Sequence, residues 1–152
     1  MNYDIPRIKG ACGFTLIELL IIVSLVGIVS VISVVFYSRF LTQNAVSNTV
    51  DQLAGELRKA QMYSMMGKQN GTWGVAYSSN KIILFQGNAF ASRNTSFDES
   101  VSITGPISIT GFSEITFAHA TGSPSATLKI TISANNNIET LNINGQGVVN
   151  KL

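Results

Sequence analysis

The sequence predicts an α+β protein in which one long N-terminal helix packs against a small antiparallel β-sheet domain. Three observations support this prediction. No proline interrupts the chain between Phe14 and Met66. From Asn44 to Met66 the apolar residues recur with the 3.6-residue period of a helix, and after Gly67 the pattern changes to the period of two that is typical of strands. One long helix followed only by strands is the element order of an α+β domain.

The chain opens with a short polar leader, residues 1–13, and continues into an apolar run over residues 14–36. The leader carries Arg7 and Lys9 against Asp4. At about 1.5 Å per residue, a run of this length can span a bilayer core, so we predict a transmembrane or filament-core helix over 14–36. Because Lys and Arg favour the cytoplasmic side, we expect the leader in the cytoplasm and the rest of the chain outside the membrane.

Residues 37–67 are predicted to continue this helix as an amphipathic segment. The two segments together form one near-continuous helix of about 50 residues, about 80 Å long at the standard rise. Gly67 is the predicted end, because glycine readily adopts the left-handed conformation that terminates helices. The apolar positions fall at steps of three and four and form one stripe; they are Val46, Val50, Leu53, Leu57 and Ala60.

Residues 68–152 are predicted to form a β-rich globular head. Its first two strands are expected at 74–77 and 81–85, around a turn at 78–80. The stretch 86–99 has the weakest pattern, and we expect a loop or variable region there. Further short strands are expected at 101–103, 107–109, 115–117, 128–133, 139–143 and 148–149, with an asparagine turn at 135–137.

The composition suits one globular domain plus one membrane segment. The chain has 152 residues, of which 45% are hydrophobic and only 12% are charged. A weakly charged, hydrogen-bonding surface fits subunits that pack side by side. The formal net charge of +2 is too small to indicate a polyanionic partner. The single cysteine, Cys12, lies in the leader, so a chain cut after Gly13 has no disulfide.

The candidate functional residues lie within residues 13–20, which read GFTLIELL. A carboxylate at the centre of an apolar span costs about 3 kcal/mol, so Glu18 is either a protonated, inert group or a functional one with a partner. A cut after Gly13 would remove the leader and leave a free amine on Phe14. Glu18 follows four residues later, one helical turn away, where it could face that amine or the amine of a neighbouring copy.

This arrangement of residues 13–20 resembles the type IV pilin family, which includes the pseudopilins of type II secretion. The resemblance implies that a prepilin peptidase cuts between Gly13 and Phe14 and methylates the new Phe14 amine. It also implies that Glu18 pairs with the Phe14 amine of an adjacent subunit during filament assembly, and that the head has a pilin-like fold. Many members of the family carry a proline late in the apolar helix, whereas residues 33–37 of this chain contain none.

The expected partners follow from the same resemblance: the prepilin peptidase, other pilin or pseudopilin subunits, an inner-membrane assembly platform, and membrane lipid before assembly. The expected location is the cytoplasmic (inner) membrane, with a single pass, and then a periplasmic or cell-surface filament. The segment 53–61, LAGELRKAQ, is also similar to H-type pseudopilins and related minor pilins, although any pilin could share its helix-packing features.

Other polar groups do not indicate catalysis or a cofactor. His119 is the only histidine, and a surface or packing role fits it better than metal binding. Asp98 and Glu99 are interpreted as solvated loop charge rather than calcium ligands. Residues 145–147, GQG, are predicted to form a hairpin turn rather than a phosphate loop. Trp73 is expected to anchor the first strand to the helix, and no nucleophile elbow or catalytic triad is visible.

The sequence therefore predicts a structural subunit, a minor pilin or pseudopilin, and not an enzyme. The alternative is a DNA-binding minor pilin for natural transformation. Clustered basic residues would favour that alternative, but the C-terminal segment 147–152 offers only Lys151 and the other cations are scattered.

Overall fold

The computed structural model describes residues 13–152, except for the side chains at 32–36 and 38. Most of the predicted leader, residues 1–12, lies outside the described residues. The chain divides into two compact units, Met1–Ser38 and Arg39–Leu152.

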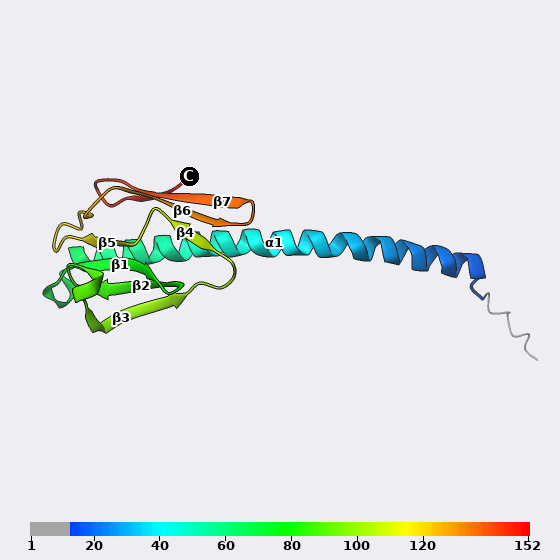
Figure 1. Cartoon of the computed structure of the whole chain (residues 1–152), viewed down its shortest axis with the longest axis horizontal. Helices are drawn as coiled ribbons and strands as arrows, with labels where there is room; N and C mark the ends of the chain where they lie inside the picture. Colours follow the sequence, from blue (N-terminus) through cyan, green and yellow to red (C-terminus); the bar gives the residue numbers. More distant parts are fainter. Residues whose placement is uncertain (1–12) are drawn as a thin grey trace, which may run out of the picture. The chain divides into compact units, whose positions relative to one another are not determined.

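The first unit contains the beginning of helix α1, which runs over Leu16–Met65 (Figure 1). Thr15 precedes the helix and caps it: the backbone N–H of Glu18 donates to Thr15 Oγ1 at 3.3 Å. The backbone N–H of Leu19 donates to the Thr15 carbonyl at 3.2 Å, which closes the first turn. Within the described residues, no helix combines the length and the apolar character needed to cross a membrane.

The second unit contains the rest of α1, and here the predicted apolar stripe is confirmed. One face of the helix is buried; its apolar members are Val46, Val50, Leu53, Ala54, Leu57 and Ala60. The helix ends at Met65, and Gly67 has the left-handed φ of 64° with its N–H donating to the Ser64 carbonyl. The prediction that Gly67 ends the helix is therefore confirmed.

The head holds two four-stranded antiparallel sheets, so the α+β prediction is confirmed while its strands divide between two sheets instead of one. The first sheet has the order β3-β2-β1-β5, with β1 Trp73–Ser78, β2 Lys81–Gln86, β3 Asn94–Ser102 and β5 Glu114–Phe117. The second has the order β4-β6-β7-β8, with β4 Ser108–Thr110, β6 Leu128–Ala134, β7 Asn137–Ile143 and β8 Val149–Lys151. Short 3-10 helices occupy Lys68–Asn70 and Phe90–Ser92.

The predicted turns are found where hairpins need them. Ser79 and Asn80 join β1 to β2 with φ values of 51° and 60°, the positive pair that a two-residue hairpin turn requires. Asn135, with φ of 51°, lies in the turn between β6 and β7. Residues 145–147 lie in the turn between β7 and β8, as predicted.

The predicted loop at 86–99 is wrong in its second half, because β3 begins at Asn94. The pairing of β3 with β2 is irregular: Leu84 faces Glu99 and Gln86 faces Asn94, so the residues of β3 between these two points bulge away from the register. Phe97 lies in this bulge and contacts Trp73, with ring centroids 6.3 Å apart. A bulge breaks the period of two, which explains why the strand has no clear sequence pattern.

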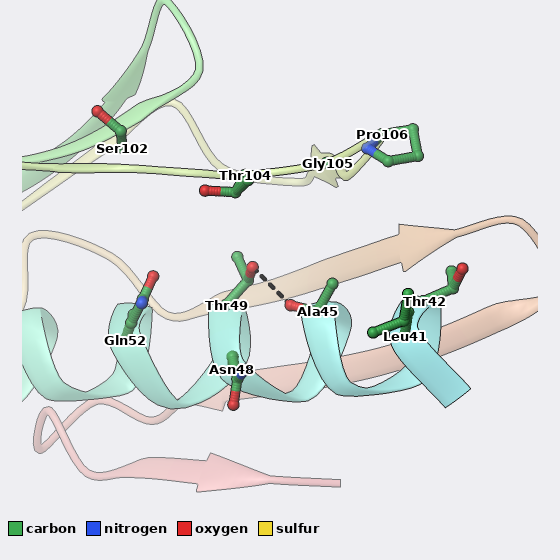
Figure 2. Close-up of a pocket in the computed structure, with 10 residues that line it drawn as sticks. All are labelled: Leu41, Thr42, Ala45, Asn48, Thr49, Gln52, Ser102, Thr104, Gly105 and Pro106. Carbon is green, nitrogen blue, oxygen red and sulfur yellow. Dashed lines mark hydrogen bonds between the residues drawn. The ribbon is translucent and has the colours of Figure 1, made fainter. Parts of the chain in front are cut away.

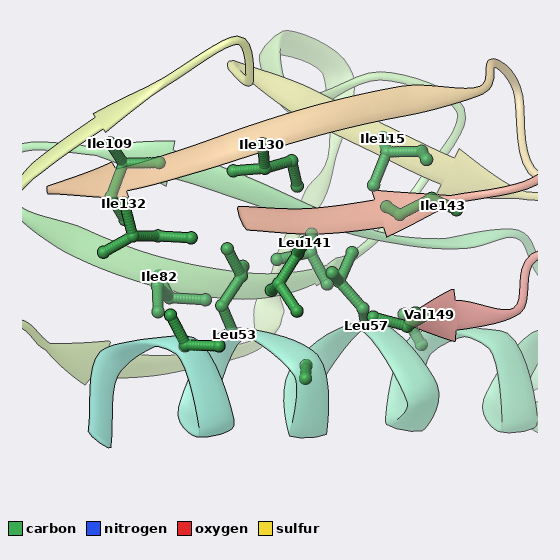
Figure 3. Packing of buried hydrophobic residues seen from close by; sticks show 14 of the residues in the cluster. Leu53, Leu57, Ile82, Ile109, Ile115, Ile130, Ile132, Leu141, Ile143 and Val149 are labelled. Atoms are coloured by element: carbon green, nitrogen blue, oxygen red, sulfur yellow. The ribbon is translucent and has the colours of Figure 1, made fainter. Parts of the chain in front are cut away.

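Both sheets pack on the same face of α1 and share one hydrophobic core (Figure 3). Leu53 and Leu57 on the helix point toward Ile82 of the first sheet and Leu141 of the second. Each fully buried Leu or Ile contributes about 1.5–3 kcal/mol relative to an exposed one. The second unit is therefore a packed domain that carries the C-terminal part of α1 as an integral element.

Trp73 connects the helix to the first sheet, as predicted. Its side chain is buried, its ring meets Tyr63 of α1 edge-on with centroids 5.0 Å apart, and its indole N–H donates to the Lys68 carbonyl at 2.9 Å. Its backbone N–H donates to the buried Ser64 hydroxyl at 2.9 Å. These contacts fix the start of β1 against the end of α1.

Candidate assembly site at the N-terminus

Gly13 and Phe14 form a short non-helical segment just before the N-cap of α1. Both are exposed, and a Cβ placed on Gly13 would meet no other atom within 4 Å. The Phe14 side chain is 74% exposed. The peptide bond between the two residues is therefore accessible in the isolated chain, as a protease would require.

Glu18 lies in the first turn of α1, where its side chain is exposed. A carboxylate is favoured at this end of a helix, because the first-turn N–H groups carry partial positive charge. In the part of the chain that the structure describes, no basic side chain forms an ion pair with Glu18. The carboxylate is thus available to a cation from another molecule.

The helix that follows Glu18 is apolar on all sides. Its large hydrophobic side chains are each about half exposed or more; they are Leu19, Leu20, Ile21, Ile22, Val23, Leu25, Val26, Ile28, Val29 and Val31. The serines between them bond within the helix: Ser24 donates to the Leu20 carbonyl at 2.7 Å and Ser30 to the Val26 carbonyl at 2.7 Å. Such a surface needs a lipid or protein cover, because a helix that is hydrophobic all round is normally buried.

The comparisons with known proteins agree with both parts of this description. Residues 8–34 match the family model of the prokaryotic N-terminal methylation motif. The fold is similar to that of the minor pseudopilin EpsH from the type 2 secretion system of Vibrio cholerae, with a TM-score of 0.53. That similarity covers 70% of this chain and 95% of EpsH at 8% sequence identity, so it concerns the fold. The chain therefore combines an N-terminal methylation motif with a fold similar to that of a pseudopilin. No curated protein matches the sequence.

Among the described residues, no group of three or more His, Cys, Asp or Glu side chains is placed to hold a metal ion. His119 is exposed in a turn after β5. The prediction that Asp98 and Glu99 lie in a loop is wrong, because both lie in β3; Glu99 is exposed to solvent as predicted, and both carboxylates are paired. Asp98 accepts from Arg93 Nε at 2.8 Å, and Glu99 accepts from Lys59 of α1.

Two charge clusters of the pilin-like head escaped the sequence prediction. In the first, Lys59 lies between Glu56 on α1 and Glu99 on β3. Burial raises the pKa of Glu56 above its ordinary value, Lys59 lowers it and Glu99 raises it further. The hydrogen bond to Glu99 raises the pKa of Lys59. The spacing of Glu56 and Lys59 was visible in the sequence, but their approach to Glu99 depends on the fold.

The second cluster surrounds Lys151 at the end of β8. Its ammonium lies 2.8 Å from Glu139 of β7 and 3.8 Å from Asp51 of α1, and it donates to the Ser47 hydroxyl at 3.2 Å. The bond to Glu139 raises the pKa of Lys151. Both clusters are partly exposed and join strands to the helix, so each ion pair contributes about 1 kcal/mol or less to stability.

Proposed function

We propose that this protein is a structural subunit, a minor pilin or pseudopilin, of a type IV pilus-like or type II secretion filament. The observation that supports this most strongly is the N-terminal motif on an exposed helix that is apolar on all sides. The large apolar side chains of this helical segment are exposed among the described residues, and filament formation would cover them. The similarity of the fold to a minor pseudopilin supports the same function.

In this proposal a prepilin peptidase cuts between Gly13 and Phe14 and methylates the Phe14 amine. The exposed, unobstructed position of Gly13 supports access to that bond. The cut would remove the cations Arg7 and Lys9 and place a positive amine at the head of the apolar segment. Before assembly the chain would be held in the cytoplasmic membrane, and the assembly platform would then transfer it into the filament.

Glu18 would pair with the Phe14 amine of an adjacent subunit. Within an apolar filament core an unpaired charge costs several kcal/mol, so any other stagger of the two helices is disfavoured. The pair would therefore set the register between subunits more than it would add net stability. The exposed carboxylate with no ion-pair partner among the described residues supports this role.

The C-terminal segment gives the DNA-binding alternative no support. Lys151, the only cation of the C-terminal segment, is paired with Glu139 and lies near Asp51, which neutralise it. The structural role alone is therefore proposed.

Two variants test the proposal at separate steps. We expect Gly13→Leu to accumulate as an uncut precursor, because a large side chain would clash in the peptidase site; the mass of the purified chain checks this. We expect Glu18→Ala to be cut and methylated normally. Its amount in the sheared filament fraction should fall about tenfold or more, because burying the unpaired Phe14 amine costs more than about 1.4 kcal/mol.

Ser24→Ala is the matched control for Glu18→Ala, because Ser24 lies in the same exposed segment and its hydroxyl bonds only its own helix. It should be processed and incorporated like the unaltered chain. Full incorporation of Glu18→Ala would refute the pairing, and normal processing of Gly13→Leu would refute the cleavage site.

A further inference from the structure

The head carries a groove of about 460 Å³ between α1 and the segment that joins β3 to β4 (Figure 2). Ala45 and Thr49 project from the helix toward this segment, and Leu41, one turn before Ala45, also lines the groove. Residues 102–106 form the opposite wall. The remaining lining residues are Thr42, Asn48 and Gln52.

The wall formed by residues 102–106 is anchored at both ends and exposed in the middle. Ile103 and Ile107 are buried in the core, while Thr104, Gly105 and Pro106 between them are exposed. The Ile103 carbonyl accepts from the Asn80 amide at 2.9 Å, and its N–H donates to the Asn80 carbonyl at 3.0 Å. The groove is therefore a fixed feature of the packed head and does not depend on a free loop.

The floor of the groove is suited to a dry contact. Leu41 and Ala45 are apolar, and Thr49 donates its hydroxyl to the Ala45 carbonyl at 2.8 Å, so this hydroxyl needs no outside partner. Among the described residues no charged one lines the groove, so a charged occupant would lose its hydration without a counter-charge. Exposed polar residues such as Gln52 and Ser102 also line the groove, so it offers both apolar and polar contacts, as protein interfaces do.

The same chain carries a surface of matching chemistry. The helical segment 19–31 has no charge, its large apolar side chains are exposed, and the hydroxyls of Ser24 and Ser30 bond inside the helix. We propose that the groove receives apolar side chains from segment 19–31 of a second copy of this chain. This inference rests on the proposed function, because the two copies must lie side by side in a filament for the contact to form.

The contact would add a helix-to-head interface to the Phe14–Glu18 pair. Helices pack when the side chains of one fill the spaces between rows of the other, and Leu41, Ala45 and Thr49 form such a row at steps of four. Only one face of segment 19–31 can enter the groove at a time. The residues that touch it must therefore recur at steps of three and four.

Disulfide mapping tests this contact in the full chain. In a Cys12→Ser background the chain has no cysteine, so every cross-link comes from introduced residues. One tagged copy carries Thr104→Cys, and a second, differently tagged copy carries single cysteines scanned through 19–31. We expect heterodimers in the filament fraction whose yield peaks every three or four positions, because a disulfide needs Cα atoms about 4.4–6.8 Å apart.

Asn136→Cys is the matched control for Thr104→Cys, since it is an exposed turn residue outside the groove. It should give about tenfold less cross-linked product than Thr104→Cys. Equal yields, a flat profile along 19–31, or capture of a different protein by Thr104→Cys would each overturn the assignment of the groove. If these outcomes occur while the chain still enters filaments, the groove inference fails and the proposed function stands.

A blocking variant gives an independent measurement. Gln52→Trp places a bulky ring at the exposed rim of the groove. Gln43→Trp is its control, because it makes the same substitution at an exposed position of α1 outside the groove. We expect Gln52→Trp alone to lower cross-linking and filament incorporation by about tenfold, while processing at Gly13 is unchanged. Equal incorporation of the two tryptophan variants would also overturn the inference.

Discussion

The two parts of α1 differ in whether their apolar side chains are buried. In residues 39–65 one face is buried under two sheets, and charged residues such as Asp51 and Arg58 fall outside the buried stripe. In residues 16–31 every side chain is exposed, and Glu18 is the only charge. The first pattern is that of a helix inside a globular domain, and the second is that of a helix awaiting a partner or a lipid.

This difference shows where the information for folding and for assembly lies. The stripe on 39–65 is matched by residues of the same chain, so it specifies the head. The apolar side chains of 16–31 are exposed, and in the proposed filament neighbouring subunits would cover them. A substitution of a buried residue in 39–65 should therefore change the stability of the head, whereas a substitution of an exposed residue in 16–31 should leave that stability nearly unchanged.

The largest difference in the free energy of unfolding is expected between Leu53→Ala and Leu20→Ala. Leu53 is 0% exposed and Leu20 is 56% exposed. Leu53→Ala should lower the free energy of unfolding of the head by about 3 kcal/mol, because it leaves a cavity in the shared core. Leu20→Ala should change it by less than about 0.5 kcal/mol. Denaturant unfolding of the full chain in detergent, followed by fluorescence of the single tryptophan, measures both. Similar losses would remove the distinction between the two parts of the helix.

A smaller contrast is expected between two serines of the same helix. Ser64 is buried, and its hydroxyl oxygen accepts a hydrogen bond from the backbone N–H of Trp73. Ser64→Ala leaves this buried donor unsatisfied and should lower the free energy of unfolding by about 1–3 kcal/mol. Ser24 is exposed and bonds only its own helix, so Ser24→Ala should leave the unfolding free energy unchanged. The same fluorescence titration compares them. A negligible loss for Ser64→Ala would mean that water or a shift of β1 satisfies the Trp73 N–H.

The features that sequence reasoning found are local ones. The stripe on α1, its end at Gly67 and the turn at Ser79 and Asn80 each follow from a few consecutive residues. The division into two sheets depends instead on long-range pairing: β1 pairs with β5, and β4 pairs with β6. The residue pattern of a single strand does not predict which other strand it will pair with. The bulge in β3 hid that strand for a related reason, since its register is set by packing around Trp73 and Phe97.

The same division applies to the functional residues. Gly13, Phe14 and Glu18 could be predicted because they lie within one contiguous motif at the start of the helix. The two walls of the groove come from residues 41–52 and 102–106, so only the folded chain brings them together. The pairing of Lys59 with Glu99 is similarly long-range and could not be predicted from the spacing of charges.

The smallest effect on stability is expected from the partly buried carboxylate of Glu56. Its pKa in the folded chain is raised above the ordinary value of 4.5, chiefly by burial, with Lys59 opposing and Glu99 adding to the increase. A raised pKa means that folding favours the protonated form. The stabilising contribution is therefore complete below the unfolded pKa and is lost as the pH rises through the folded pKa.

Glu56→Gln should consequently match the unaltered chain near pH 4 and be equally or slightly more stable at pH 7, by less than about 1 kcal/mol. Thermal unfolding between pH 4 and pH 8 measures this difference. Asp51→Asn is the control, because Asp51 is an exposed carboxylate on the same helix. Lys59 stays protonated throughout this range, since the Glu99 carboxylate raises its pKa further above neutrality. A Glu56→Gln chain that becomes progressively less stable than the unaltered chain as the pH rises would show that the attraction of Lys59 outweighs the burial of the carboxylate.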